Sequence, residues 1–391
     1  MKERMRFLFF SYLTLLSIVS FAQRTETTVF ASGTNGYKTF RIPAIVRLPE
    51  GTILAFCEGR VNGPGDFGDN DLVMKRSTDK GLTWSALQVV ADYGSLQCSG
   101  PAPVFDDSDP AFPKGRLFLF YNTGTCKESE MLKGNGLVRC MYKTSTDGGL
   151  TWSEPVEITK MVHRPNKPDI DTAFHFSDDW RYYANTPGHA LQLKDGMYKG
   201  RLYVSANHSA GPPQPAAGHY QAHGYYSDDH GKTFHISESV ASPGSNESMS
   251  VQLSGNGLMM NSRNQKGNIR ARIVSLSSDG GSTWDTTYFD KNLPDPVCQG
   301  SVLNIGNRNG KKGIAFCNAA DTTQRNHLTL RISSDEGLTW KRSWLIASAP
   351  EGYKGDYSAY SDIVEMDKKR VGVLYEKENY SKIVFTIVNW K

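Results

Sequence analysis

An arginine and several carboxylates near the ends of apolar segments are the residues of this chain that could take part in chemistry. Arg41 lies in the tetrapeptide Phe-Arg-Ile-Pro (40–43), directly before the apolar stretch 44–48, which we expect to be a buried strand. A buried arginine is costly unless an anion pairs with it. That anion could be a structural carboxylate or the carboxylate of a ligand, because the guanidinium fork matches a carboxylate in bidentate geometry.

A glycine-rich loop follows a second predicted strand, which ends near Glu58. Three aspartates lie close together in this loop, Asp66, Asp69 and Asp71. The simplest interpretation is a solvated loop. A cation site is the alternative, because hard cations prefer clustered carboxylate oxygens.

Glu247 and Arg263 are predicted to lie at the same end of one β-hairpin. Two strand-like segments, 246–253 and 257–264, are separated by Ser-Gly-Asn, which is a typical turn sequence. On residue types alone, this pair would form a cross-strand salt bridge.

An eight-residue phrase, Ser-x-Asp-x-Gly-x-Thr-Trp, recurs along the chain and indicates which elements position these residues. Its aspartate can accept bonds from backbone amides further on and its glycine allows a positive φ, so each copy predicts a tight turn. The threonine and the aromatic residue then begin the next strand. Four copies end in Trp and a fifth ends in Phe: Ser77–Trp84, Ser145–Trp152, Ser277–Trp284, Ser333–Trp340 and Ser227–Phe234.

These copies, called Asp boxes below, predict an all-β fold, a β-propeller with Asp-box hairpin turns. Five copies indicate five or more blades, and we favour a six-bladed β-propeller. They begin about 50 to 80 residues apart, which suits one four-stranded blade plus insertions. One blade cannot bury its apolar face alone, so neighbouring blades must stack. The 391 residues, 11% aromatic content and 37 glycines fit a single such domain over residues 23–391.

Residues 1–22 predict a secretory signal peptide. Lys2, Arg4 and Arg6 precede an apolar run, and small residues follow near position 20. The run is short for a membrane span, so an uncleaved anchor is less favoured. We therefore expect an exported protein, periplasmic, cell-surface or extracellular, without stable membrane insertion after signal removal.

Charge and cysteine usage exclude some partners and leave disulfides open. Three of the 44 basic and one of the 40 acidic residues lie in 1–22, so the mature chain has a net charge of +2 and gives no reason to expect nucleic acid as a partner. The six cysteines form no CxxC pair and the histidines of 161–226 show no zinc spacing, so no metal is predicted. Buried thiols and disulfides remain equally compatible with an exported protein.

The Phe-Arg-Ile-Pro sequence followed by repeated Asp boxes resembles the exo-α-sialidase (neuraminidase) family, secreted glycoside hydrolases that remove terminal sialic acids. The resemblance covers about residues 30–390. It implies a six-bladed propeller that acts on sialylated glycoproteins, glycolipids or oligosaccharides. It implies no metal and no organic cofactor.

The same resemblance implies that arginines from distant parts of the chain bind the substrate carboxylate. The three that match are Arg41, Arg263 and Arg325, with Arg331 as the competitor for the third position. In Leu-Tyr-Glu (374–376), the family's supporting acid corresponds to Glu376, which would keep Arg41 oriented.

Tyr-Ser-Asp-Ile (360–363) resembles the family motif that carries a nucleophilic tyrosine. Tyr360 fits this motif better than Tyr357, because Ile363 then takes the place of the family's leucine. The resemblance implies that Glu247 assists this nucleophile. The alternative is that Tyr360 is an ordinary core residue, since the chain has 18 tyrosines.

The aspartate-rich loop matches the family's acid/base loop. Asp66 would be the acid/base, with Asp69 as the fallback. Arg60, six residues before Asp66, matches the position of an arginine that contacts the sugar.

Together these roles imply retaining hydrolysis through a tyrosyl-sugar intermediate. One alternative is a hydrolase for a related 2-keto-3-deoxy sugar acid, which would keep the three arginines and differ elsewhere in the pocket. A second alternative, of another class, is a non-catalytic Asp-box propeller that binds glycans or proteins. Such a module would have no reason to retain Tyr360, Glu247 and Asp66 beside three arginines.

Overall fold

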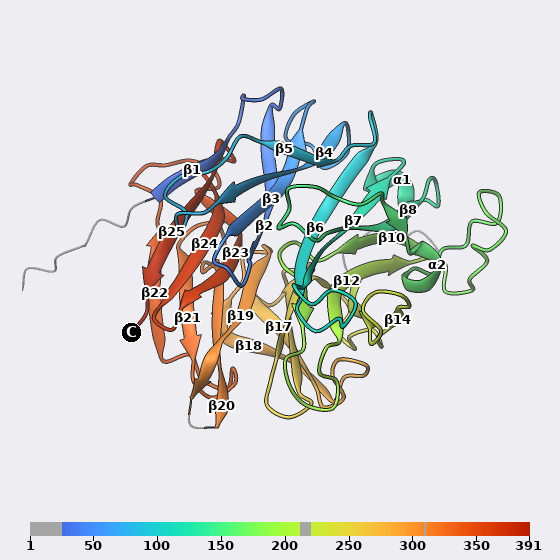
Figure 1. Ribbon diagram of the computed structural model, residues 1–391. Helices are drawn as coiled ribbons and strands as arrows, with labels where there is room; N and C mark the ends of the chain where they lie inside the picture. Colours follow the sequence, from blue (N-terminus) through green and yellow to red (C-terminus); the bar gives the residue numbers. More distant parts are fainter. Residues whose placement is uncertain (1–25, 212–219, 309) are drawn as a thin grey trace, which may run out of the picture.

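The computed structural model describes residues 26–211, 220–308 and 310–391, and over these ranges the chain is almost entirely β-structure (Figure 1). Its strands form antiparallel meanders, accompanied by two short helices, α1 (Glu128–Met131) and α2 (Thr159–Val162). The predicted signal peptide, residues 1–22, lies outside the described residues. Within the described part, no helix has the length and apolar character needed to cross a membrane.

Four of the sheets contain four or five strands each. One runs in the order β1 (Glu26–Ala31), β25 (Lys382–Asn389), β24 (Arg370–Lys377), β23 (Ser358–Asp367). Another runs β10 (Trp180–Asn185), β12 (Leu202–Ala210), β13 (Tyr220–Ser227), β14 (His235–Ile236), with β11 (Leu191–Gln192) also paired to β12. The remaining two run β15 (Ser245–Gln252), β16 (Leu258–Asn264), β17 (Ala271–Ser277), β18 (Thr286–Pro294), and β19 (Gly300–Arg308), β20 (Lys311–Ala319), β21 (Leu328–Ser333), β22 (Arg342–Ala347).

A fifth sheet joins eight strands. They are β2 (Thr39–Arg47), β3 (Ile53–Arg60), β4 (Asn70–Ser77), β5 (Gln88–Ala91), β6 (Gln97–Asp106), β7 (Arg116–Gly124), β8 (Val138–Ser145) and β9 (Val156–Glu157). Two antiparallel meanders, β2–β5 and β6–β9, meet in this sheet through one parallel pair, Asn70 with Gln97. The described residues thus form five sheets instead of six separate ones, in an all-β, propeller-like arrangement.

The two ends of the described chain meet in one sheet. The last strand, β25, pairs with β24 on one side and with β1 on the other. In Figure 1 the blue β1 accordingly lies beside the red β25. This pairing covers the edge that β25 would otherwise expose.

All five Asp boxes form the predicted turns. In the first, the hydroxyl of Ser77 accepts the N–H of Gly81, and Asp79 accepts both the N–H and the hydroxyl of Thr83. Gly81 has a φ of 86°, which is the left-handed conformation that glycine permits. The other four boxes repeat this pattern.

The aromatic residues of the boxes connect one meander to the next. The ring of Trp84 lies 5.6 Å from that of Phe385 on β25, and the ring of Trp152 lies 6.0 Å from that of Phe56 on β3. A Cβ atom at Gly81 would lie 2.2 Å from Phe385, so this contact leaves no space for a side chain at the turn. The boxes therefore help neighbouring meanders to stack.

Apolar side chains are buried between neighbouring sheets. Ile53 of β3 shares one cluster with Phe385 of β25, and Phe120 of β7 lies 5.9 Å, ring to ring, from Tyr225 of β13. All six cysteines are free thiols, and five of them are buried. The sequence left open whether the cysteines form disulfides, and in the structure all six remain free thiols.

The strands that begin the meanders position the site. β2 contacts β6 and β23, β23 contacts β19, and β19 contacts β15. A cavity at their beginnings is lined by Ile42, Gly100, Glu247 and Tyr360. A second cavity at their ends is lined by Arg47, Val104, Val251 and Glu365. These strands therefore run side by side in one direction, which brings side chains from distant parts of the sequence together at their beginnings.

Candidate active site

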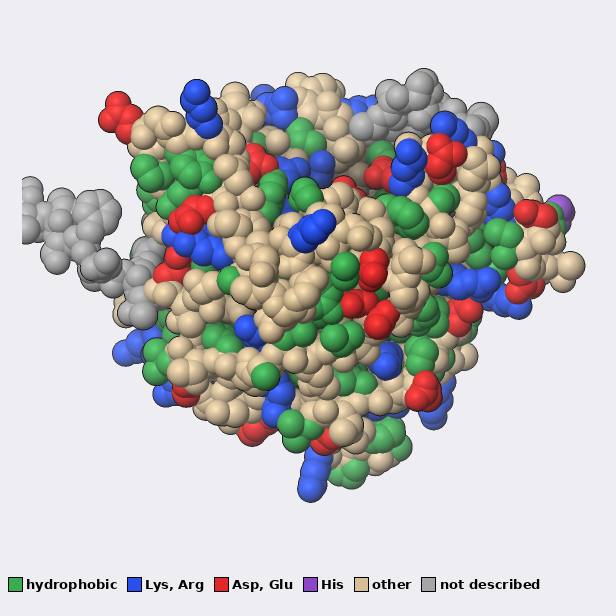
Figure 2. Space-filling view, turned by 90° about the horizontal axis from the view of Figure 1, so that it is seen from above, with side chains coloured by type: hydrophobic (Ala, Val, Ile, Leu, Met, Phe, Trp, Pro, Cys, Tyr) green, Lys and Arg blue, Asp and Glu red, His purple; other side chains and the backbone are tan. Residues whose placement is uncertain are grey.

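The cavity at the beginnings of the inner strands has a volume of about 410 Å³ and a strongly polar lining. Five of the predicted site residues line it, Arg60, Asp66, Glu247, Arg263 and Tyr360. The face seen in Figure 2 has a hollow in which basic and acidic side chains lie side by side. The other three predicted residues, Arg41, Arg325 and Glu376, do not line it, but Arg325 lines an adjoining cavity that Arg263 also borders.

Arg41 on β2 is held by Glu376 on β24. Its Nε donates to Oε1 of Glu376 at 2.7 Å, and one terminal nitrogen donates to Oε2 at 3.4 Å. Both side chains are buried. Burial opposes the charge of Arg41, but the Glu376 carboxylate outweighs it and raises the arginine's pKa. The strand begins at Thr39, so Arg41 lies inside it and not before it as the sequence suggested.

A strained bulge follows Arg41. Ile42 has a φ of 60°, and the pairing of β2 with β3 shifts between Arg41 and Ala44. A positive φ at a β-branched residue costs about 1–3 kcal/mol and persists only where the surroundings fix it. Glu376 supplies that fixation, because its Oε1 also accepts the N–H of Ile42 at 2.9 Å. The bulge and the arginine therefore share one buried carboxylate.

Glu247, Arg263 and Tyr360 form a hydrogen-bonded triangle. Tyr360 donates its hydroxyl hydrogen to Oε1 of Glu247 at 2.5 Å, and Arg263 donates to Oε2 of Glu247 at 2.7 Å. The same nitrogen of Arg263 also lies 2.9 Å from the Tyr360 hydroxyl. The salt bridge expected at this end of the hairpin β15–β16 is confirmed, and a phenol is added to it.

The surroundings of Tyr360 keep its hydroxyl protonated. Burial raises its pKa well above the ordinary value, and the negative charge of Glu247 raises it further. Arg263 and Arg325 act in the opposite direction. The phenol therefore needs a base to become a phenolate, and Glu247 is the carboxylate in hydrogen-bond contact with it.

Arg325 reaches the site from the loop between β20 and β21. Its guanidinium carbon lies 5.4 Å from the Tyr360 ring centroid, and that of Arg41 lies 5.5 Å from the same centroid. With Arg263 at 2.9 Å from the Tyr360 hydroxyl, three guanidinium groups surround one phenol. Such a set can bind a carboxylate next to the tyrosine.

The competing residues lie elsewhere. Arg331 is within β21 and donates to the side chain of Asn318 at 3.2 Å. Tyr357 precedes β23, and its ring packs against Tyr353, 5.0 Å away.

Asp66 lies on the exposed loop after β3 and is tied to Arg60. One terminal nitrogen of Arg60 donates to Oδ1 of Asp66 at 2.9 Å and to the carbonyl of Pro64 at 2.6 Å. Arg60 is buried and also pairs with Glu58 at 2.6 Å, whereas the Asp66 side chain is 80% exposed. An accessible carboxylate held at the cavity rim is suited to proton exchange with a bound molecule.

The other two loop aspartates differ from Asp66. Asp71 is buried and accepts the hydroxyl of Tyr37 at 2.6 Å, so it has a structural partner. Asp69 is partly exposed and does not line the cavity. Among the described residues, these three aspartates do not come close enough to share a cation.

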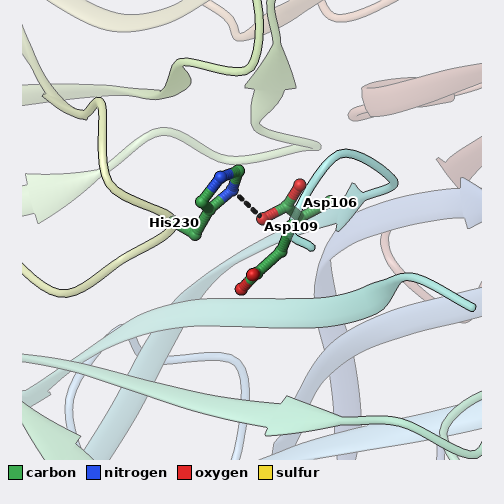
Figure 3. A group of neighbouring side chains, drawn as sticks. All are labelled: Asp106, Asp109 and His230. Atoms are coloured by element: carbon green, nitrogen blue, oxygen red, sulfur yellow. Dashed lines mark hydrogen bonds and ion pairs between the residues drawn. The ribbon is translucent and has the colours of Figure 1, made fainter. Parts of the chain in front are cut away.

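A different group in the described part of the chain, Asp106, Asp109 and His230, has the proximity of metal ligands (Figure 3). Its oxygens are already engaged. His230 bonds to Asp106 at 2.9 Å, and Arg116 donates to Asp109 at 3.0 Å. Asp106 is the last residue of β6, so this group lies away from the cavity at the beginnings of the strands. We interpret it as a structural connection between β6 and the Asp box at 227–234.

Glu128 is a cavity residue that the sequence did not indicate. It begins α1, a single helical turn, and lines the cavity. It accepts the hydroxyl of Tyr220. Its side chain is solvent-accessible at the cavity, and partial desolvation, followed by the charges of Asp66 and Glu247, raises its pKa to about 7. A four-residue helix has no periodic pattern that could have revealed it.

Two tyrosines complete the surroundings of the site. Tyr182 lines the cavity, whereas Trp180 and Tyr183 pack against buried histidines. Tyr380, in the turn between β24 and β25, lies over Arg41. Sequence reasoning identified neither Tyr182 nor Tyr380 as a site residue.

The chain is similar to known proteins over most of its length. The BNR repeat-like domain family matches residues 51–373. A sialidase from Micromonospora viridifaciens is 32% identical over 372 residues, which cover 90% of this chain and 52% of that protein. The chain thus spans about half the length of this relative.

Two further similarities cover more of the related protein. An exo-alpha-sialidase from Arthroderma benhamiae is 30% identical over 374 residues, covering 90% of this chain and 80% of that protein. The solved structure of a microbial sialidase, Hadza Hz136, is similar with a TM-score of 0.78 and 26% identity, covering 94% of this chain and 68% of that one.

Proposed function

The chain belongs to the exo-α-sialidase family, as its sequence predicted, and from this membership we propose that it hydrolyses terminal sialic acids from glycoproteins, glycolipids or oligosaccharides. The observation that carries the proposal is the Tyr360 phenol, hydrogen-bonded to Glu247 and surrounded by three guanidinium groups. Sialic acid has a carboxylate on its anomeric carbon, so a site for it needs fixed positive charge beside a nucleophile.

A neutral nucleophile suits this substrate. A carboxylate nucleophile approaching the anomeric carbon would meet the substrate carboxylate at about 4 Å, with a repulsion of about 4 kcal/mol at an effective dielectric constant of about 20. A tyrosine avoids that repulsion, and sialidases are the known exception to carboxylate nucleophiles among glycosidases. Arg41, Arg263 and Arg325 bind the carboxylate in this proposal, and Glu376 orients Arg41.

The proposed reaction has two steps. In the first, Tyr360 attacks the anomeric carbon and passes its proton to Glu247, while Asp66 protonates the departing glycosidic oxygen. In the second, Asp66 takes a proton from water, the water oxygen bonds to the anomeric carbon, and the Tyr360–carbon bond breaks as Glu247 returns the proton. Two inversions give net retention. Arg60 holds Asp66 at the rim throughout.

The propeller interpretation extends to six blades. We count β2–β5 and β6–β9 as two blades, because a single parallel pair, Asn70 with Gln97, joins them. The other four sheets supply four more blades. Export of the protein through the signal peptide at 1–22 is part of the same proposal.

Incubation with a fluorogenic aryl sialoside tests the function. We expect the full chain to release the fluorophore, and proton NMR to show the α-anomer of the sugar first. Tyr360→Phe should lose at least about a hundredfold in kcat, because the nucleophile is gone. Tyr357→Phe is the matched control and should keep its activity. Release from 2-keto-3-deoxy acid glycosides but not from sialosides would instead favour the related sugar-acid hydrolase, and no turnover of either would favour a binding module.

A further inference from the structure

The turn between β24 and β25 has an unusual backbone. Three consecutive residues without a glycine, Glu378, Asn379 and Tyr380, have φ values of 54°, 51° and 63°. Left-handed conformations are rare for such residues and seldom occur in succession. Strain of this kind persists only where the surroundings determine it, and it clusters at functional sites.

Contacts from a distant segment fix this turn. The N–H of Glu378 donates to the carbonyl of Tyr357 at 2.9 Å, and the N–H of Asn379 donates to the carbonyl of Asp356 at 2.7 Å. The Asn379 side chain donates to the carbonyl of Lys354 at 3.1 Å. The segment 354–357, which leads into the strand of Tyr360, therefore holds the turn in its strained form.

The result of this conformation is the placement of the Tyr380 ring between two arginines of the site. The guanidinium carbon of Arg41 lies 3.9 Å from the ring centroid, which is a direct stack. A terminal nitrogen of Arg325 donates to the Tyr380 hydroxyl at 3.0 Å. That hydroxyl donates in turn to Asp356. One side chain thus contacts two guanidinium groups by two different interactions.

Other strained residues adjoin the same two arginines. Ile42, with a φ of 60°, directly follows Arg41. Val297, with a φ of 64°, places its carbonyl 3.4 Å from a terminal nitrogen of Arg325. Both arginines therefore adjoin a β-branched residue with a strained backbone. This indicates that the fold fixes the positions of the two arginines at a cost in backbone conformational energy.

From these contacts we infer that Tyr380 is a positioning residue that fixes the spacing and orientation of Arg41 and Arg325 for carboxylate binding, an inference that rests on the proposed function. Stacking covers a face of the Arg41 guanidinium and leaves open the edge that Glu376 does not occupy, and an arginine binds a carboxylate through its edge. The Tyr380 hydroxyl accepts from one terminal nitrogen of Arg325, and the Val297 carbonyl lies 3.4 Å from the other. The tyrosine therefore orders both groups without taking the place of the substrate.

Two variants separate the two interactions. Tyr380→Phe keeps the stack on Arg41 and removes the acceptor for Arg325, whereas Tyr380→Leu removes both. For Tyr380→Phe we expect free N-acetylneuraminic acid to bind about tenfold more weakly by calorimetry, and KM for the aryl sialoside to rise similarly, because a charged hydrogen bond is lost. We expect kcat to change by less than about threefold, because binding energy common to ground and transition states appears in KM. Tyr380→Leu should show a larger loss of affinity than Tyr380→Phe.

Tyr375→Phe is the matched control. Tyr375 lies on β24 and also donates its hydroxyl to a carboxylate, that of Glu26, at 2.5 Å. Thermal unfolding will show whether each variant is folded. A KM effect in Tyr375→Phe as large as that in Tyr380→Phe would mean that loss of any buried phenol in this sheet suffices, and would overturn the inference.

A double-mutant cycle with Arg325→Ala tests whether Tyr380 acts on carboxylate binding through Arg325. If Tyr380 acts through Arg325, Tyr380→Phe should change the affinity of the Arg325→Ala variant for the free acid by less than about twofold, since coupled effects do not add. Fully multiplicative effects would overturn the inference while leaving an active wild type, and so the proposed function, intact. A wild type that neither cleaves sialosides nor binds the free acid would overturn both.

Discussion

Tyr360 donates its hydroxyl hydrogen to Glu247 across 2.5 Å, although 113 positions separate the two residues in the sequence. The second oxygen of the same carboxylate accepts from Arg263 at 2.7 Å. This arrangement orients the carboxylate toward the phenol and pairs it with a permanent cation. Glu247 is therefore placed to take the proton of a buried tyrosine whose pKa is raised.

Glu247→Gln should separate this role from simple packing. The amide keeps the shape but cannot accept the phenolic proton, so we expect kcat on an aryl sialoside to fall by about 10²–10⁴. Affinity for the free sugar acid should change less than kcat, because the arginines remain. Steady-state kinetics and calorimetry measure the two effects. Near wild-type kcat in the Glu247→Gln enzyme would contradict the assignment of the base.

Asp66→Asn should show a loss that depends on the leaving group. An alkyl sialoside or sialyllactose needs a proton on its departing oxygen, so its kcat/KM should fall by about 10²–10⁴. An aryl sialoside leaves as a stable phenolate and should lose less. Asp69→Asn is the control, because Asp69 does not line the cavity. Equal losses on both substrates would argue against Asp66 as the acid, and a larger effect at Asp69 would transfer the role to that residue.

The chain's own sequence predicted local features well and non-local ones poorly. Each Asp box was predictable because its bonds join residues at most four positions apart, as between Asp79 and Thr83. Motif resemblance also located Arg41 and Glu376, which the structure joins at 2.7 Å. The all-β, propeller-like fold followed from the repetition of such units. The pairing of Asn70 with Gln97, which joins two meanders in one sheet, could not be predicted, because it depends on a single contact between residues far apart in the sequence.

Glu128 and Tyr380 could not be identified as site residues from the sequence, because distant parts of the chain create their surroundings. The surroundings of Glu128 come from Tyr220, 92 positions away, and from the charges gathered in the cavity. Tyr380 has a positive φ in a turn without glycine, and such a conformation is produced by tertiary contacts and not by local preference. Residues of this kind can be found only once the strands are assembled.

Glu128→Gln should change the pH dependence of stability. The folded-state pKa of Glu128 is about 7, against an ordinary value of 4.5, so between these values the folded chain holds a proton that the unfolded chain has lost. Stability therefore falls as pH rises through this window. Glutamine is neutral throughout, so the variant should gain stability relative to wild type between pH 5 and pH 7.5.

Urea unfolding at both pH values measures this gain. Glu130→Gln is the control, since Glu130 lies on the same helical turn but pairs with Lys133 at the surface, where its pKa is lowered. A Glu128→Gln variant whose stability relative to wild type is the same at pH 5 and pH 7.5 would show that Glu128 ionises normally in the folded protein.

His163→Phe should make the protein more resistant to acid. His163 is buried, and neither ring nitrogen has a hydrogen-bond partner among the described residues. Burial lowers its pKa well below 6.5, as it does for His223, and lowers that of His208 to about 3. All three are neutral in the folded state, whereas the unfolded chain takes up protons below about pH 6.5. Stability must then fall as pH drops below 6.5, by about 1.4 kcal/mol per histidine at pH 5.5.

Phenylalanine has a similar shape, needs no hydrogen bond and takes up no proton in the unfolded chain. The ring of Tyr183 lies 4.8 Å from that of His163, so an aromatic replacement keeps this contact. We expect the stability of His163→Phe relative to wild type to rise by about 1.4 kcal/mol between pH 7.5 and pH 5.5, measured by urea unfolding. His175→Gln, at an exposed position, should show no such change. If His163→Phe gained nothing at the lower pH, His163 would have to be protonated in the folded protein, and a buried anion would then be needed beside it.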